Sequence, residues 1–210
     1  MRDVACGKLR FTPGFLFLAA LLFYRGTPPF LTTFFLAAAL HECAHILTAR
    51  LLRVSVRSLS FTAFGCVLRL ADQTMLPGRT LFLIAAAGPA VNLAVALLCH
   101  ILSGLWYQLN LFGAENLLLA LFNLLPVFPL DGAVLLSVRL SHKMPNGKGE
   151  RTVCILTLLL AATGALTALH MSGRARLRIL LFAGWMAAGA LQKLDLSIFR
   201  LSGKIKKSVK

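Results

Sequence analysis

The sequence predicts a polytopic, mainly α-helical membrane protein with about six transmembrane helices and one small membrane-associated β-hairpin. Hydrophobic residues make up 58% of the 210 residues and charged residues only 14%, against about 25% charged in ordinary soluble domains. The apolar residues form long runs, and the basic residues fall between these runs. Little chain is left for a soluble module, so we expect one membrane domain over residues 1–196 and a basic cytoplasmic tail over 197–210.

The N-terminal part of the chain predicts two membrane helices. Residues 11–24 form an apolar run after a short basic segment, and no convincing small-residue cleavage site follows to mark a signal peptide. We therefore expect a short first span there. Residues 25–29 contain two prolines and predict a turn, and residues 30–47 predict the second span.

Residues 51–72 have a different pattern and predict a β-hairpin. β-branched or alternating residues occupy 54–57 and 66–70, with Gly65 between them. Four further apolar runs predict the remaining spans. They cover residues 80–102, 111–125, 152–169 and 177–194, with a polar turn at 72–78, a basic loop at 139–151 and a disordered basic tail from 200 to 210.

The distribution of positive charge predicts the orientation in the bilayer. With a cytoplasmic N-terminus, 18 of the 22 Lys and Arg residues fall on the inside and four on the outside. This bias indicates that both termini are cytoplasmic. Nucleic acid is not an expected partner despite the net charge of +15, because no soluble domain carries a basic face.

A metal-binding motif lies near the end of the second predicted span. His41 and His45 are four residues apart and therefore share one face of a helix, with Glu42 beside them. At this H-E-x-x-H spacing two imidazoles can bind one Zn²⁺ ion while the glutamate acts as the base. Cys43 is turned about 200° from His41 in a helix, so it is not an expected ligand.

The third zinc ligand is expected to be an acidic residue far along the chain. Asp131 follows a long apolar run and two prolines, where an ionised carboxylate costs about 2.5–3.5 kcal/mol unless a partner offsets that cost. Asp72 is the competing candidate, although its polar turn needs no metal to explain it. Glu115, at the start of the fourth span, is expected at the membrane interface.

These residues predict peptide hydrolysis. A bound zinc ion lowers the pKa of water to roughly 7, and Glu42 would take a proton from the attacking water and pass one to the leaving amine. The amides of Asn92 and Asn123 could hold the substrate backbone or the oxyanion. The predicted hairpin could hold an extended substrate by strand addition.

Three motifs together resemble the site-2 proteases, a family of intramembrane zinc metalloproteases of the M50 type. They are H-E-x-x-H at 41–45, Gly-Pro-x-x-Asn at 88–92, and Asn-x-x-Pro-x-x-Pro-x-Asp-Gly at 123–132. The resemblance implies that His41, His45 and Asp131 are zinc ligands and Glu42 the base. It also implies that Asn123 and Pro129 act in substrate handling.

Six spans with both ends inside are most similar to the sporulation branch of that family, which processes an inactive pro-sigma factor in a bacterial cell membrane. The resemblance implies a membrane-tethered protein substrate. The 14 residues from 197 to 210 leave no room for the nucleotide-sensing domain common in that branch, so regulatory membrane proteins are expected instead. The alternatives are a membrane metal permease, which has no use for Glu42 as a proton carrier, and an inactive membrane scaffold.

Overall fold

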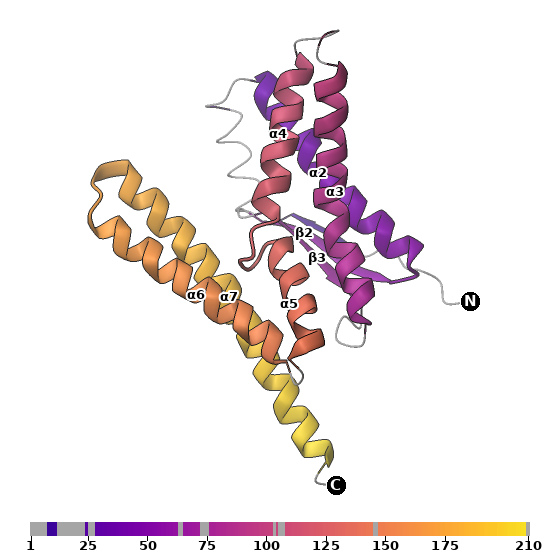
Figure 1. Ribbon diagram of the computed structural model, residues 1–210, viewed down its shortest axis with the longest axis vertical. Helices are drawn as coiled ribbons and strands as arrows, with labels where there is room; N and C mark the ends of the chain where they lie inside the picture. Colours follow the sequence, from indigo (N-terminus) through magenta and orange to yellow (C-terminus); the bar gives the residue numbers. More distant parts are fainter. Residues whose placement is uncertain are drawn as a thin grey trace. The chain divides into compact units, whose positions relative to one another are not determined.

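The structure is a computed structural model that describes residues 8–11, 24, 28–62, 65–71, 76–102, 104, 108–144 and 147–208. The chain divides into two compact units, Met1–Asn123 and Leu124–Lys210, and each is described by itself (Figure 1). Among the described residues, the first unit combines three long helices with a small sheet, and the second contains only helices and their connections.

Helix α2 (Pro28–Leu51) begins at a proline, which is tolerated in the first helical turn because its missing N–H has no intrahelical partner there. The helix ends in a Schellman motif. Arg53 adopts a left-handed conformation with φ 58°, and the N–H of Val54 donates to the carbonyl of Ala49 at 2.8 Å. This turn directs the chain from the helix into the sheet.

The sheet has the strand order β1-β2-β3. Its strands are β1 (Lys8–Phe11), β2 (Val56–Thr62) and β3 (Gly65–Leu70). β2 and β3 form the predicted hairpin, with Leu59 opposite Leu68. β1 adds to β2 in parallel, with Leu9 opposite Leu59. Phe11, expected in the first span, instead ends this strand, while Tyr24 is helical and the rest of the predicted span 11–24 lies outside the described residues.

Helices α3 (Gly78–Leu102) and α4 (Gln108–Asn123) pack against each other and against α2. Small residues allow this close packing. A Cβ at Gly113 would lie 2.9 Å from Cβ of Cys99, so α4 passes very close to α3 at that glycine. The core that joins α2 and α3 to the sheet consists of Ala49, Val54, Val56, Leu70 and Ile84.

Glu115 is buried in this three-helix unit, with 5% of its surface exposed, and its position at the membrane interface stays a prediction. Its Oε1 accepts a hydrogen bond from Thr33 on α2 at 3.0 Å. Its Oε2 has no hydrogen-bond partner among the described residues. The carboxyl group faces α2, because α4 packs against that helix and Thr33 donates to it from there.

The second unit consists of a connecting loop and three helices: α5 (Asp131–Lys143), α6 (Lys148–Leu169) and α7 (Gly173–Ser208). The loop folds tightly over the start of α5, because a Cβ at Gly132 would clash with the backbone of Leu124 and Leu125. The core of this unit consists of Phe128, Ala133, Val153, Cys154 and Ala190.

Two sequence predictions in this unit were wrong. The segment 139–151, expected as a basic loop, belongs largely to α5 and α6, because Val134, Leu136 and Leu140 form an apolar helix face that packs against the core. The tail expected to be disordered continues α7 to Ser208. Residues 197–208 contain no proline to break the helix, and isoleucine and lysine recur there.

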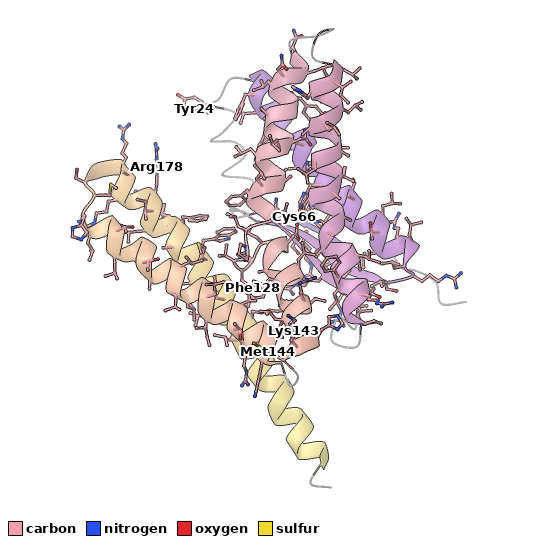
Figure 2. The ribbon with its side chains drawn as sticks, in the orientation of Figure 1. Tyr24, Cys66, Phe128, Lys143, Met144 and Arg178 are labelled. Carbon is pink, nitrogen blue, oxygen red and sulfur yellow. The ribbon has the colours of Figure 1, made fainter. Side chains whose placement is uncertain are left out.

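The protein is an integral membrane protein with four described helices that are long and apolar enough to cross a bilayer. They are Phe30–Leu51, Gly78–Leu102, Lys148–Leu169 and Gly173–Leu194. The predicted span 111–125 is also helical, but the 16 residues of α4 are fewer than a straight crossing requires. Many large apolar side chains point outward from these helices, as expected for a lipid-facing surface (Figure 2).

Candidate metal centre

The two histidines of the motif lie on one buried face of α2. His41 is 4% exposed and His45 is 5% exposed. Their ring centroids are 4.7 Å apart, with the ring planes at 82°, and their Nε2 atoms approach to 3.0 Å. The helical spacing predicted from the sequence therefore brings one nitrogen of each ring to the same point.

The other nitrogen of each ring has its own hydrogen-bond partner on α3. Nδ1 of His45 lies 2.6 Å from the carbonyl oxygen of Ile84, which can only accept, so this nitrogen donates. Nδ1 of His41 lies 2.6 Å from Oδ1 of Asn92. Helix α3 thus orients both rings by holding their outer nitrogens, as is usual for histidines that bind a metal.

The donor set fits a metal ion. With both Nδ1 atoms protonated, a neutral imidazole presents a lone pair at Nε2. Two such lone pairs, 3.0 Å apart at His41 and His45, repel each other unless a proton or a cation lies beside them. Zinc accepts neutral imidazole nitrogen as a ligand, and the buried pair is arranged to supply two of them.

Gly88 provides the space that the two rings occupy. A Cβ at this position would lie 2.6 Å from Cε1 and 2.7 Å from Nε2 of His41, and it would also clash with Nε2 of His45. Only a residue without a side chain permits α3 to pass so close to the histidines. Pro89, which follows it, is fully buried inside α3.

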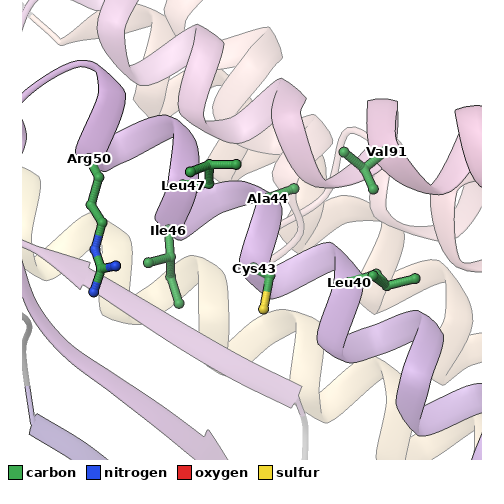
Figure 3. Close-up of a pocket in the computed structure, with 7 residues that line it drawn as sticks. All are labelled: Leu40, Cys43, Ala44, Ile46, Leu47, Arg50 and Val91. Atoms are coloured by element: carbon green, nitrogen blue, oxygen red, sulfur yellow. The ribbon is translucent and has the colours of Figure 1, made fainter.

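Glu42 and Cys43 follow His41 on other faces of α2. Glu42 is partly buried, and Cys43 is exposed, as expected from its rotation away from His41. Cys43 lines a hollow of about 420 Å³, which is bounded by residues of α2 and by Val91 of α3 (Figure 3). Neither histidine lines this apolar hollow, so it is distinct from the candidate metal centre. Its lining residues are Leu40, Cys43, Ala44, Ile46, Leu47, Arg50 and Val91.

The other predicted site residues lie further along the chain. Asn123 ends α4, and its Nδ2 donates to the carbonyl of Leu119 at 3.0 Å. Asp131 is the first residue of α5 and is partly buried. Pro129 lies exposed in the loop that precedes α5. Asp72, the competing third ligand, lies outside the described residues.

Asn92 is fully buried, and its amide is engaged within the protein. Besides its contact with His41, its Nδ2 donates to Oδ1 of Asn116 at 2.7 Å and to the carbonyl of Ala37 at 3.2 Å. Sequence reasoning did not single out Asn116. The sequence does contain a signal for it, because an amide in the middle of an apolar membrane helix needs a hydrogen-bond partner.

Comparisons with known proteins agree with this arrangement. Residues 29–108 match the sequence profile of Peptidase family M50. The putative zinc metalloprotease Rip3 of Mycobacterium tuberculosis is 40% identical over 106 residues, which are 44% of this chain and 26% of that protein. Stage IV sporulation protein FB of Bacillus subtilis is 26% identical over 161 residues, which are 72% of this chain and 56% of that protein.

The chain thus spans about a quarter to a half of the length of these relatives. Among solved structures, the site-2 protease from Methanocaldococcus jannaschii has a similar fold, with a TM-score of 0.68 at 22% identity. The match covers 88% of this chain and 89% of that one. The matched profile includes His41, Glu42, His45, Gly88 and Asn92, the residues whose geometry is described above. Residues 29–108 of the chain therefore resemble peptidase family M50, and the chain has a fold similar to that of the Methanocaldococcus jannaschii site-2 protease.

Proposed function

We propose that this protein is a zinc-dependent intramembrane endopeptidase that hydrolyses a peptide bond in or near the membrane segment of a protein substrate. The observation that carries this proposal is the pair of Nε2 atoms of His41 and His45, 3.0 Å apart and buried beside Glu42. They lie in the segment that matches Peptidase family M50. The relative from Mycobacterium tuberculosis is named as a zinc metalloprotease, which supports zinc as the metal.

His41, His45 and Asp131 are the proposed protein ligands. Each offers one ligand atom of a kind that zinc accepts, an imidazole nitrogen or a carboxylate oxygen. Three protein ligands leave the fourth tetrahedral position open, as catalytic zinc sites require. Asp131 is the candidate because it follows two prolines at the start of α5 and precedes Gly132, in the third family motif.

Glu42 is the proposed general base. A bound zinc ion would supply Lewis-acid activation of water and of the scissile carbonyl. Glu42 accepts a proton from the attacking water and transfers a proton to the departing amine. Asn92, Asn123 and Pro129 are the proposed substrate-handling residues, and the amide of Asn123 is proposed to hold the substrate backbone or the oxyanion. Asn92 is proposed to act on the substrate only indirectly, by holding His41, because its own amide is buried.

The substrate must present an extended segment, because a helical peptide hides its carbonyls in hydrogen bonds. The outer edge of β3 is the proposed docking strand, since β2 occupies its other edge. The Bacillus relative is named as a sporulation protein, so a membrane-associated pro-sigma factor is the proposed substrate. The proposed location is a bacterial cell membrane with both termini cytoplasmic and with regulatory membrane proteins as partners.

The test compares wild type with Glu42→Gln in zinc content and in cleavage of membrane-tethered substrates, including a pro-sigma-like N-terminal segment. Both proteins should contain near one zinc ion per chain. Cleavage by Glu42→Gln should fall by at least about 100-fold, the usual contribution of a general base. Equal cleavage by the two proteins would refute the assignment of Glu42 and the protease function with it.

Asp131→Ala tests the third ligand in the same assay. Zinc content and cleavage should both fall, because the site would lose one of its three protein ligands. Asp72→Ala is the matched control, since it also removes one carboxylate and should leave both quantities unchanged. Loss of zinc in Asp72→Ala, with zinc retained in Asp131→Ala, would show that Asp72 is the third ligand and Asp131 is not.

A further inference from the structure

A series of hydrogen bonds between buried side-chain amides connects α4 through α3 to the ring of His41 on α2. Asn116 on α4 contacts Asn92 on α3, and Asn92 contacts His41. Asn92 and Asn116 are both fully buried. Their hydrogen bonds are 2.6 and 2.7 Å long, which is short for bonds between nitrogen and oxygen.

The donor-to-acceptor direction of these hydrogen bonds is set by a backbone carbonyl beside Asn116. Nδ2 of Asn116 donates to the carbonyl of Phe112 at 2.8 Å, and that carbonyl can only accept. Oδ1 of Asn116 must therefore face Asn92, which presents Nδ2 to it. The carbonyl of Ala37 also requires Nδ2 of Asn92 as its donor.

With Nδ2 of Asn92 used by two acceptors, its Oδ1 is the atom that faces His41. An amide oxygen accepts but does not donate, so Nδ1 of His41 must carry the proton. Nε2 of His41 is then left with its lone pair directed at the candidate metal centre. If Asn92 turned over, its NH₂ group would face Nδ1, and the ring would favour the tautomer that cannot bind a metal through Nε2.

We infer that Asn116 is a positioning residue that acts through Asn92 to hold His41 in the metal-binding tautomer. Asn116 does not contact the histidine. Its acceptor oxygen and the Ala37 carbonyl together hold Asn92 in one orientation, and the Ala37 contact, at 3.2 Å, is the longer of the two. The inference rests on the proposed function, because it assigns Asn116 a role in the affinity for zinc.

A residue needed only for packing would affect folding but not the affinity for zinc. Asn116→Leu keeps the branched shape and the number of heavy atoms and removes both the donor and the acceptor. Asn116→Asp, protonated in this apolar core, keeps an acceptor for Asn92 and a donor for the Phe112 carbonyl. Glu115→Met is the matched control, because Glu115 is the buried neighbour on α4 and its bond goes to Thr33 instead.

The experiment measures zinc affinity by competition with a chelator, and the thermal stability of the metal-free protein, for wild type and the three variants. Asn116→Leu should lower zinc affinity by about tenfold, the lower end of the range for residues that orient a metal ligand. Asn116→Asp should restore most of that loss, and Glu115→Met should bind zinc like wild type. Wild-type affinity in Asn116→Leu, or an equal loss in Glu115→Met, would overturn the inference.

A second measurement needs no variant and so does not depend on their folding. The ¹⁵N chemical shifts of the His41 ring in metal-free wild type report which nitrogen is protonated. A proton on Nδ1 is expected, and a proton on Nε2 would overturn the inference. Neither measurement uses a peptide substrate. If wild type binds zinc but cleaves nothing, the proposed function fails while the assignment of Asn116 can still hold.

Discussion

At the scale of single residues, a missing side chain is as important to the candidate centre as the side chains that are present. Gly88 lies against both imidazole rings, which are held on their other sides by Asn92 and the Ile84 carbonyl. These contacts with α3 therefore restrict the movement of both rings. From sequence alone, Gly88 could have been only a packing point between helices, and the structure adds its contact with the metal ligands.

Gly88→Ala should lower zinc affinity by about 10- to 100-fold, a loss like that caused by other changes to ligand orientation. The added methyl group must displace a histidine ring and break its bond to α3. Gly104→Ala is the control, because a Cβ at that position would meet no other described residue within 4 Å apart from its chain neighbours. Zinc titration of the two purified variants gives the comparison, and equal affinities would contradict this account of Gly88.

At the scale of secondary-structure elements, the loop before α5 depends on helices α6 and α7. The N–H of Phe128 donates to the hydroxyl of Thr157 on α6 at 3.1 Å. Lys193 on α7 forms a 2.9 Å ion pair with Glu150 and lies 5.9 Å from the centre of the Phe128 ring. These contacts set the position at which α5, and with it Asp131, begins.

Two glycines of α7 provide a matched test of this dependence. A Cβ at Gly189 would lie 2.9 Å from Cδ and 3.0 Å from the backbone nitrogen of Pro129, whereas a Cβ at Gly184 meets nothing within 4 Å. Gly189→Ala should therefore destabilise the fold by about 1–3 kcal/mol through overpacking and should reduce cleavage. Gly184→Ala should be neutral or stabilising by up to about 1 kcal/mol.

This prediction is checked by measuring the unfolding midpoints and the cleavage rates of the two α7 variants. The helix propensity gained from glycine to alanine is the same at both positions, so the difference between them isolates the contact with Pro129. Similar midpoints and similar rates would show that the loop adapts to the added methyl group and does not depend on Gly189.

At the scale of the whole molecule, the main open property is the orientation in the membrane. Helix α6 has 22 residues and is about 33 Å long, enough to cross a hydrocarbon core of about 30 Å. Lys148 at its start and Arg176 beyond its end are both exposed. Arg178 extends away from the same region of α7 (Figure 2).

Single cysteines at these two ends test the orientation predicted from charge. In a variant without the native cysteines, Arg176→Cys should react with a membrane-impermeant maleimide added to intact cells. Lys148→Cys should react only after the membrane is permeabilised. The reverse pattern would place both ends of α6 on the opposite sides and would contradict the distribution of 18 inside and four outside positive charges.

The membrane class, the main helices, the hairpin and the paired histidines can all be predicted from the amino-acid sequence alone. These features depend on local periodicity and on apolar composition, which are written in consecutive residues. Spacing of four was enough to place His41 and His45 on one face of α2. Helix α5 was not predicted, because the basic residues of 139–151 obscure the apolar periodicity of its face. Strand β1 was not predicted either, because its four residues pair with β2, which is distant in the sequence.

The surroundings of the two histidines, in contrast, depend on how the helices pack. Asn92 and Asn116 are 24 residues apart and meet because α3 packs against α4, and Glu115 is buried for the same reason. The orientation of an amide and the tautomer of an imidazole depend on partners supplied by other helices. No local pattern contains that information, because it arises from which donors and acceptors remain available once the three helices have packed.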